Sequence, residues 1–235
     1  MFLSVFDIFK IGIGPSSSHT MGPMTAAARF LEDLRSGREK EPGAGNLAAL
    51  GCTLYGSLAF TGKGHATDRA VILGLSGYLP ATLDPDRAEQ LEAEVRGTGL
   101  VTPPGLPPLR FAPSTDLVFD YGAPLPGHAN GMILRAFDEA GNLYLEETYY
   151  SIGGGFVATA RDLAAQAQGV GLHDEKQAAG YPYPFGTAAE MLAMGRASGK
   201  TIAEMKWANE TARHPARDVQ ARLDAVWHAM EACID

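Results

Sequence analysis

Three histidines stand in glycine-rich polar turns, where a side chain can reach a bound ligand. They are His19 in PSSSHTMGP, His65 in TGKGHATD and His128 in PLPGHANGM. Histidine exchanges protons near neutral pH, so each is a candidate general acid or base. The hydroxyl groups of the first turn add hydrogen-bond donors that occupy little space. Together these residue types favour the capture of a small anionic ligand that carries a hydroxyl group.

The first two turns each precede a predicted helix. A helix N-terminus has unpaired N–H groups and a partial positive charge, which favour a carboxylate or a phosphate. Serine-rich turns also serve as N-caps, but one serine is enough for that purpose. Ser16, Ser17 and Ser18, followed by His19 and Thr20, exceed that need. We therefore interpret this turn as a ligand-binding segment.

The surroundings of the other histidines are different. His173, His214 and His228 have no comparable setting, and we interpret them as structural residues. For His65 and His128, spacing alone leaves the structural and the functional interpretation equally open.

Two segments of the sequence resemble nucleotide-binding motifs but do not match them. GIGPSS (12–17) has a serine in place of the third glycine of G-x-G-x-x-G, and no strand clearly precedes it. GSLAFTGKG (56–64) has five residues where a P-loop has four, and Gly64 replaces the hydroxyl residue that binds magnesium. Nucleotide binding is therefore disfavoured. Lys63 either contacts an anion or faces solvent.

Hydrophobic periodicity predicts the elements that carry the first two turns. Apolar residues at i, i+3, i+4 and i+7 predict a helix from Pro23 to about Gly37. The segment 49–60 predicts a strand, and a second helix begins at Thr67 or Asp68 and ends near residue 77.

The middle of the chain predicts extended structure. Residues 97–115 are rich in proline and allow only short extended pieces. Residues 132–152 form two β-rich runs around the turn signal DEAGN and predict a hairpin, which ends in three glycines.

After about residue 160 the patterns become helical. Thr187-x-x-Glu190 and Thr201-x-x-Glu204 match the capping box. The segment 216–235 repeats apolar residues at helical spacing and ends without a glycine or a capping residue. It reads as a helix cut in mid-element, although a frayed terminal helix would give the same pattern. The predicted fold class is α+β, a mixed β-sheet flanked by helices with a helical C-terminal extension.

Composition limits the partners of this protein. The 235 residues carry a formal net charge of −8 and lack the clustered Lys and Arg that phosphate binding needs, so we expect no nucleic acid. No apolar run approaches the ~18 residues that span a bilayer, and no signal peptide is evident, so we expect no membrane and a cytoplasmic location. Cys52 and Cys233 show no metal or redox spacing, and we expect no metal ligands in this chain.

Five segments resemble one family. FDIFKIGIGPSSSHTMGPM, YGSLAFTGKGHATD, LPGHANGM and TYYSIGGGFV are similar to the N-terminal β domain of single-chain, iron–sulfur-dependent bacterial L-serine dehydratases. VWHAMEACID resembles the stretch that leads into the second domain of that family. The resemblance covers essentially the whole chain, in order. It implies a β domain over 1–158 and a helical linker over 159–235.

The resemblance also implies an activity. Members of the family convert L-serine to pyruvate and ammonia with a [4Fe–4S] cluster and without pyridoxal phosphate. The cluster cysteines lie in a C-terminal α domain that this sequence lacks, so we expect a fragment or a subunit that needs an α domain in cis or in trans. A homodimer is a further expectation from the resemblance.

The resemblance assigns the catalytic roles to His65 and His128. Asn130 and the turn 16–20 would position L-serine. Further substrate-binding candidates are Lys63, Thr67 and Asp68. Sequence does not decide which histidine is the base, and we favour His65 because Thr67 and Asp68 could orient its ring.

Two other interpretations stay open at this point. The β domain also resembles an allosteric substrate-binding domain of some D-3-phosphoglycerate dehydrogenases, which implies a regulatory module that binds serine or a related hydroxy acid without catalysis. A purely structural oligomerisation domain is the third. It would bind no serine and would tolerate changes throughout residues 16–20.

Overall fold

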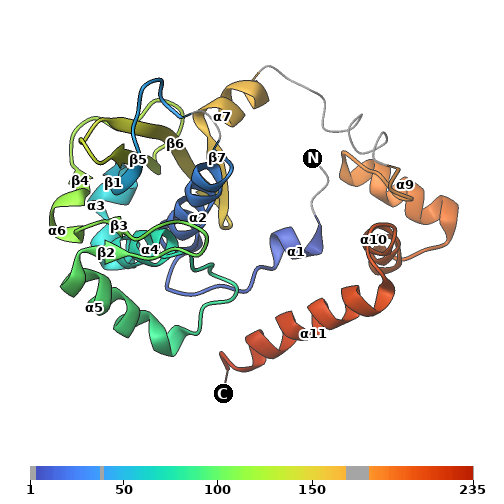
Figure 1. Ribbon diagram of the computed structural model, residues 1–235. Coiled ribbons are helices and arrows are strands. Elements are labelled where there is room, and N and C mark those ends of the chain that lie inside the picture. Colours follow the sequence, from blue (N-terminus) through green and yellow to red (C-terminus); the bar gives the residue numbers. More distant parts are fainter. Residues whose placement is uncertain (1–3, 38–39, 168–179, 235) are drawn as a thin grey trace. The chain divides into compact units, whose positions relative to one another are not determined.

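The computed structural model describes residues 4–37, 40–167 and 180–234 (Figure 1). These residues form two compact units. We call residues 12–167 the sheet unit, and residues 4–11 together with 180–234 the helical unit. The division into these units does not test the domain boundary predicted between residues 158 and 159, which stays a prediction.

The sheet unit is built on a mixed sheet, as predicted. Its strands run in the order β2-β3-β1-β5-β6-β7, and β4 also pairs with β1. β1 is parallel to β3 and β4 and antiparallel to β5, and the pairs β2–β3, β5–β6 and β6–β7 are antiparallel. The strands are β1 (Leu47–Tyr55), β2 (Leu100–Val101), β3 (Leu109–Arg110), β4 (Leu117–Asp120), β5 (Gly131–Asp138), β6 (Leu143–Gly153) and β7 (Phe156–Thr159).

The predicted hairpin is confirmed as β5 and β6. Alternate residues of β5, namely Met132, Leu134 and Ala136, are fully buried, whereas the residues between them are half-buried. This period-2 pattern lays one face of the hairpin on the core. The proline-rich stretch between β1 and β5 contains the short strands β2 and β3, as predicted.

The predicted helices are confirmed as α2 (Gly22–Arg35) and α4 (Thr67–Leu75). Phe30 and Leu31 of α2 are completely buried in one core cluster with Leu54 of β1 and Tyr149 of β6. Burial of each such side chain favours folding by about 1.5–3 kcal/mol. Figure 1 shows α2 and α4 next to each other beside the sheet. The sheet unit also contains α5 (Ala88–Thr98), α7 (Ala160–Ala167) and the 3₁₀ turn η3 (Pro85–Arg87).

Two local predictions are wrong. The strand predicted over 49–60 ends at Tyr55, and its last residues form the short helix α3 (Ser57–Phe60). Gly56 causes the change, because its φ of 54° turns the chain out of the strand direction. The proline-rich stretch is also not entirely extended, since α6 (Pro113–Asp116) begins with a proline at a position that helices tolerate.

The helical unit contains α1 (Val5–Ile8), α9 (Ala188–Ser198), α10 (Ile202–Thr211) and α11 (Ala216–Glu231). Both predicted capping boxes are confirmed, at Thr187 and Thr201. The predicted helical C-terminal segment is α11. Within the described residues, no helix is long and apolar enough to cross a lipid bilayer.

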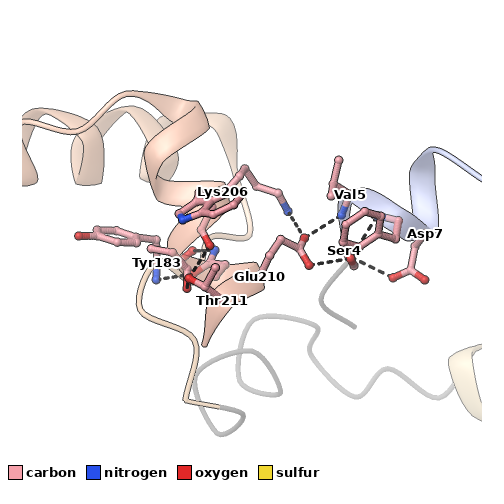
Figure 2. Close-up of polar contacts among 11 residues, drawn as sticks. Ser4, Val5, Asp7, Tyr183, Lys206, Glu210 and Thr211 are labelled. Carbon is pink, nitrogen blue, oxygen red and sulfur yellow. Dashed lines mark hydrogen bonds and ion pairs between the residues drawn. The ribbon is translucent and has the colours of Figure 1, made fainter. Parts of the chain in front are cut away.

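One buried carboxylate joins the two sequence segments of the helical unit. Glu210 is 5% exposed and accepts hydrogen bonds from the Ser4 hydroxyl and the Val5 N–H, both at 2.8 Å. The Lys206 ammonium lies 3.9 Å from the same carboxylate (Figure 2). The negative charge therefore sits at the N-terminus of α1, where N–H groups lack helical partners.

Candidate active site

The first histidine turn is itself helical. Residues Ser17–Met21 form one π-helical turn, η1, and Ser16 caps it by accepting the His19 N–H at 3.1 Å. Ser16 therefore has the capping role that one serine can supply. Ser18 has a different task, because its hydroxyl lies 2.9 Å from His19 Nδ1. The Ser17 side chain is exposed.

The second histidine turn is fastened to the first by two reciprocal hydrogen bonds. The Thr20 hydroxyl donates to the His65 carbonyl at 2.8 Å, and the Thr67 hydroxyl donates to the His19 carbonyl at 2.6 Å. Ala66 links the 3₁₀ turn η2 (Gly62–His65) to α4 with a φ of 53°. Among the described residues it alone, apart from glycines, has a positive φ. Such backbone strain persists where the surroundings fix the conformation.

These hydrogen bonds bring two imidazoles together. The ring centroids of His19 and His65 lie 4.9 Å apart, and the ring planes are inclined by 36°. The two side chains are half-buried. Protonation of both rings at once is unfavourable at this distance, because the two positive charges repel each other.

The third histidine turn joins through the segment that follows β1. The Ala129 carbonyl, next to His128, accepts the Ser57 N–H at 2.9 Å. A Cβ on Gly56 would lie 2.3 Å from the same carbonyl oxygen, so only glycine allows this approach. Asn130 is held by β6, where its side-chain amide donates to the Ser151 carbonyl at 3.1 Å. The turn of His128 is thereby fixed against the end of β1.

Hydrogen bonds determine the neutral tautomer of two histidines. His65 Nδ1 lies 2.9 Å from the Thr61 carbonyl, and a carbonyl oxygen only accepts. Neutral His65 thus carries its proton on Nδ1 and has its lone pair on Nε2, the arrangement of a base. His128 is the opposite case, because its Nδ1 accepts the Asn130 N–H at 3.1 Å. Neutral His128 therefore carries its proton on Nε2 and is a hydrogen-bond donor there.

His19 lies between two hydroxyl groups. Ser18 Oγ is 2.9 Å from Nδ1, and Ser57 Oγ is 2.9 Å from Nε2. A hydroxyl both donates and accepts, so either neutral tautomer of His19 is satisfied. Burial lowers the pKa of His19, the neighbouring His65 lowers it further, and hydrogen bonding to Ser57 acts in the opposite direction. The net shift favours the neutral imidazole.

Asp68 and Lys63 have partners of their own. Asp68 forms an ion pair with Arg96 at 2.9 Å, and the Lys63 ammonium lies over the Phe119 ring, 5.5 Å from its centroid. The expected orientation of the His65 ring by Thr67 and Asp68 is wrong, because the Thr61 carbonyl holds its Nδ1. Thr67 instead acts on His19.

Two of the histidines interpreted as structural, His214 and His228, belong to the helical unit. His228 Nδ1 lies 2.6 Å from the Asp224 carbonyl one helical turn earlier, and His214 is exposed. His173 lies outside the described residues.

Sequence reasoning missed Gly56, Ser57 and Thr61. A glycine directly after a strand is a typical signal for the end of that strand and could have indicated Gly56 and Ser57. The predicted strand over 49–60 includes both residues and therefore hides this signal. Thr61 acts through its carbonyl, and no residue type indicates such a role.

Two of the hollows in the sheet unit lie near polar or charged groups that could bind a ligand. One of about 200 Å³ borders the first two turns and includes Thr20, Ala66 and Arg69 in its wall. The other, of about 80 Å³, is lined by charged residues such as Arg29, Asp33 and Glu147. Part of its charge is satisfied internally, since Arg29 pairs with Asp162 at 3.2 Å, and no histidine lines it. The convergence of the three turns, not either hollow, marks the candidate site.

The described residues do not fit an iron–sulfur cluster. Cys52 is buried in β1, and burial raises the pKa of its thiol, whereas a metal ligand must be a thiolate. Cys233 is exposed in the helical unit. Within residues 4–37, 40–167 and 180–234, no three His, Cys, Asp or Glu side chains are grouped so that they could hold a metal ion.

The comparisons with known proteins all indicate the same protein family. Residues 4–162 match the family model described as serine dehydratase beta chain. L-serine dehydratase of Streptomyces coelicolor is 40% identical over 235 residues, which are 100% of this chain and 50% of that protein. L-serine dehydratase of Haemophilus influenzae and L-serine dehydratase 1 of Escherichia coli are each 37% identical, over 99% of this chain and 49% and 48% of their own lengths. The chain thus spans about half the length of the curated relatives it matches.

Proposed function

The chain belongs to the serine dehydratase beta chain family, and from this membership we propose that it is the β domain of an L-serine dehydratase. The complete protein would deaminate L-serine to pyruvate and ammonia. The observation that carries the proposal for this chain is the convergence of the turns of His19, His65 and His128 into one hydrogen-bonded site.

The chemistry of the reaction matches this site. Deamination of L-serine removes the proton from Cα and expels the β-hydroxyl group. We assign proton removal to His65, because Nε2 of its neutral form holds the lone pair. We assign His128 the role of a hydrogen-bond donor to the substrate, because its neutral form carries the proton on Nε2.

Substrate binding falls to the surrounding polar groups. L-serine brings a carboxylate, an ammonium group and a hydroxyl group. The exposed Ser17 hydroxyl and the N–H groups that begin its helical turn suit the carboxylate, whereas the Thr20 hydroxyl already donates to His65. The side-chain oxygen of Asn130 suits the ammonium group, since the amide nitrogen already donates to Ser151.

We propose that the group that activates the leaving hydroxide comes from outside the described residues. We propose a [4Fe–4S] cluster held by an α domain, in the part of the relatives' length that this chain does not cover. The chain alone is therefore expected to form no pyruvate from L-serine.

A chimera tests the proposal. This chain replaces the matched half of the Streptomyces coelicolor L-serine dehydratase, and pyruvate formation from L-serine is followed under anaerobic conditions. We expect turnover in the chimera. His65→Ala should reduce turnover by about 10²-fold or more, as for loss of a general base, with iron and sulfide content unchanged.

The matched control is His214→Ala, which removes an exposed histidine of the helical unit and should retain turnover. Wild-type turnover in the His65→Ala chimera would remove His65 from the mechanism. Calorimetry that measures L-serine binding to this chain distinguishes the catalytic from the regulatory function. Serine binding by the chain, combined with an inactive but cluster-loaded chimera, would favour a regulatory module instead.

A further inference from the structure

The polar groups of Ser57 connect, directly or through Thr61, to all three histidine turns. Its hydroxyl lies 2.9 Å from His19 Nε2. Its N–H donates to the Ala129 carbonyl at 2.9 Å, beside His128. Its carbonyl accepts the Thr61 hydroxyl at 2.9 Å and the Thr61 N–H at 3.0 Å.

The third of these connections continues to His65. The Thr61 carbonyl holds His65 Nδ1 at 2.9 Å, so only Thr61 separates Ser57 from the proposed base. Each histidine turn is therefore tied to a different polar group of one residue.

The local backbone explains why Ser57 can do this. It is the first residue of α3, so its N–H has no partner within that helix and is available to the third turn. Gly56 places it there, with a φ of 54° and a ψ of −131° that side chains of L-residues rarely allow. Position and conformation thus direct the N–H to one turn and the hydroxyl to another.

We propose that Ser57 is a positioning residue that sets the relative placement of the three histidines through its hydroxyl and its backbone. The inference deepens the proposed function and rests on it for the catalytic consequence. The hydroxyl holds the His19 ring at Nε2 while Ser18 holds it at Nδ1. The ring of His19 is thereby kept against the ring of His65.

The Ser57 hydroxyl also satisfies the His19 ring in either neutral tautomer. In the tautomer with the proton on Nδ1, the Ser57 hydroxyl donates a hydrogen bond to Nε2 and Nδ1–H donates to Ser18 Oγ. In the tautomer with the proton on Nε2, Nε2–H donates to Ser57 Oγ and the Ser18 hydroxyl donates to Nδ1. No proton is gained or lost between these two states. Without the Ser57 hydroxyl, Nε2 loses this partner and the ring is held from one side only.

The test is Ser57→Ala in this chain, which deletes the hydroxyl and leaves both backbone connections. With the histidines isotope-labelled, NMR reports the nuclear Overhauser effect between the ring protons of His19 and His65. We expect the effect to be lost in Ser57→Ala and kept in Ser57→Thr, which restores a hydroxyl. Ser76→Ala is the matched control, because the Ser76 hydroxyl donates to the Ile72 carbonyl within its own helix.

The same variants in the chimera report the catalytic consequence. We expect Ser57→Ala to lower kcat at least tenfold with a smaller change in KM, and Ser57→Thr to recover most of the loss. If Ser57→Ala does not fold, Ser57→Cys replaces it, since a thiol has a similar shape but is a weak hydrogen-bond donor.

The outcomes separate the two proposals. An unchanged ring-to-ring effect in Ser57→Ala overturns the positioning role, and so does unchanged turnover in an active chimera. An inactive wild-type chimera contradicts the proposed function, while the NMR result still decides the placement of the rings.

Discussion

The rings of His19 and His65 lie 4.9 Å apart, although their turns belong to distant parts of the sequence. Each turn donates a threonine hydroxyl to the histidine carbonyl of the other, Thr20 to His65 and Thr67 to His19. The pair is therefore fixed by the backbone as well as by the rings. A proton on one ring raises the energy of a proton on the other.

The first prediction concerns the pH dependence of stability. Folding lowers the pKa of His19 below its ordinary value of 6.5, chiefly through burial. Between the two values the unfolded chain binds more protons than the folded chain, so the free energy of unfolding rises with pH. This stability is complete above the ordinary pKa and is lost as the pH falls toward the lowered one.

His19→Gln removes that titration. Urea unfolding followed by circular dichroism at several pH values, from about 5 to 7.5, should give a shallower pH dependence for the variant than for the wild type. Ser76→Ala, which loses a hydrogen bond away from the histidines, should lower stability by a similar amount at every pH. Parallel curves for His19→Gln and wild type would contradict the prediction.

The second prediction concerns Gly56. Gly56→Ala would place a Cβ 2.3 Å from the Ala129 carbonyl oxygen and force a backbone conformation that is unfavourable for alanine. We expect the free energy of unfolding to fall by more than about 2 kcal/mol, measured by urea unfolding. Gly64→Ala is the matched control, because its Cβ would meet nothing within 4 Å. Equal stability of the two variants would show that the third turn does not depend on this close approach.

The main elements of the sheet unit were predictable because their signals are local. The stripe of apolar residues in α2, the N-terminus of α4 at Thr67 and the period-2 burial of β5 all follow from neighbouring residues. Gly56 is the exception, because the chain leaves the predicted strand at this residue and continues as α3. Its left-handed turn is required by a carbonyl of residue 129, and no local pattern contains that constraint.

The site was predictable only in its residue types. Polar, glycine-flanked histidines predicted a common site, and the structure brings their turns together, whereas the catalytic roles stay a prediction. The partners of the rings were not predictable. His65 is oriented by a backbone carbonyl, and Asp68, the neighbour expected to help, pairs with Arg96 instead.

The third prediction uses that ion pair. Asp68→Asn should leave the affinity for L-serine and the turnover of the chimera within about twofold of wild type. Its stability should fall by about 1 kcal/mol or less, because the pair with Arg96 is partly exposed. The measurements are calorimetry, pyruvate formation and urea unfolding. A tenfold loss of turnover at full cluster content would assign Asp68 to the catalytic site.

The fourth prediction concerns the helical unit. Glu210→Ala removes the acceptor of the Ser4 hydroxyl and the Val5 N–H and leaves both groups without that partner (Figure 2). Hydrogen bonds to a charged group contribute about 1.5–3 kcal/mol, so the amide of Val5 should exchange with solvent at least about tenfold faster. Amide hydrogen exchange measures this directly. Glu231→Ala, at the end of α11, is the charge-matched control and should leave the Val5 exchange rate unchanged.

The fifth prediction concerns a buried hydroxyl beside the site. Ser151 is completely buried, and its hydroxyl has no hydrogen-bond partner among the described residues. A Cβ on Gly22 would lie 2.0 Å from this oxygen, so the hydroxyl packs directly against the start of α2. Burial of an unsatisfied hydroxyl costs about 1–3 kcal/mol, and Ser151→Ala removes that cost while it leaves the backbone carbonyl that holds Asn130. We expect an unchanged or higher free energy of unfolding by urea. A clear loss of stability would mean that the hydroxyl has a partner, such as a bound water, that stabilises this end of β6.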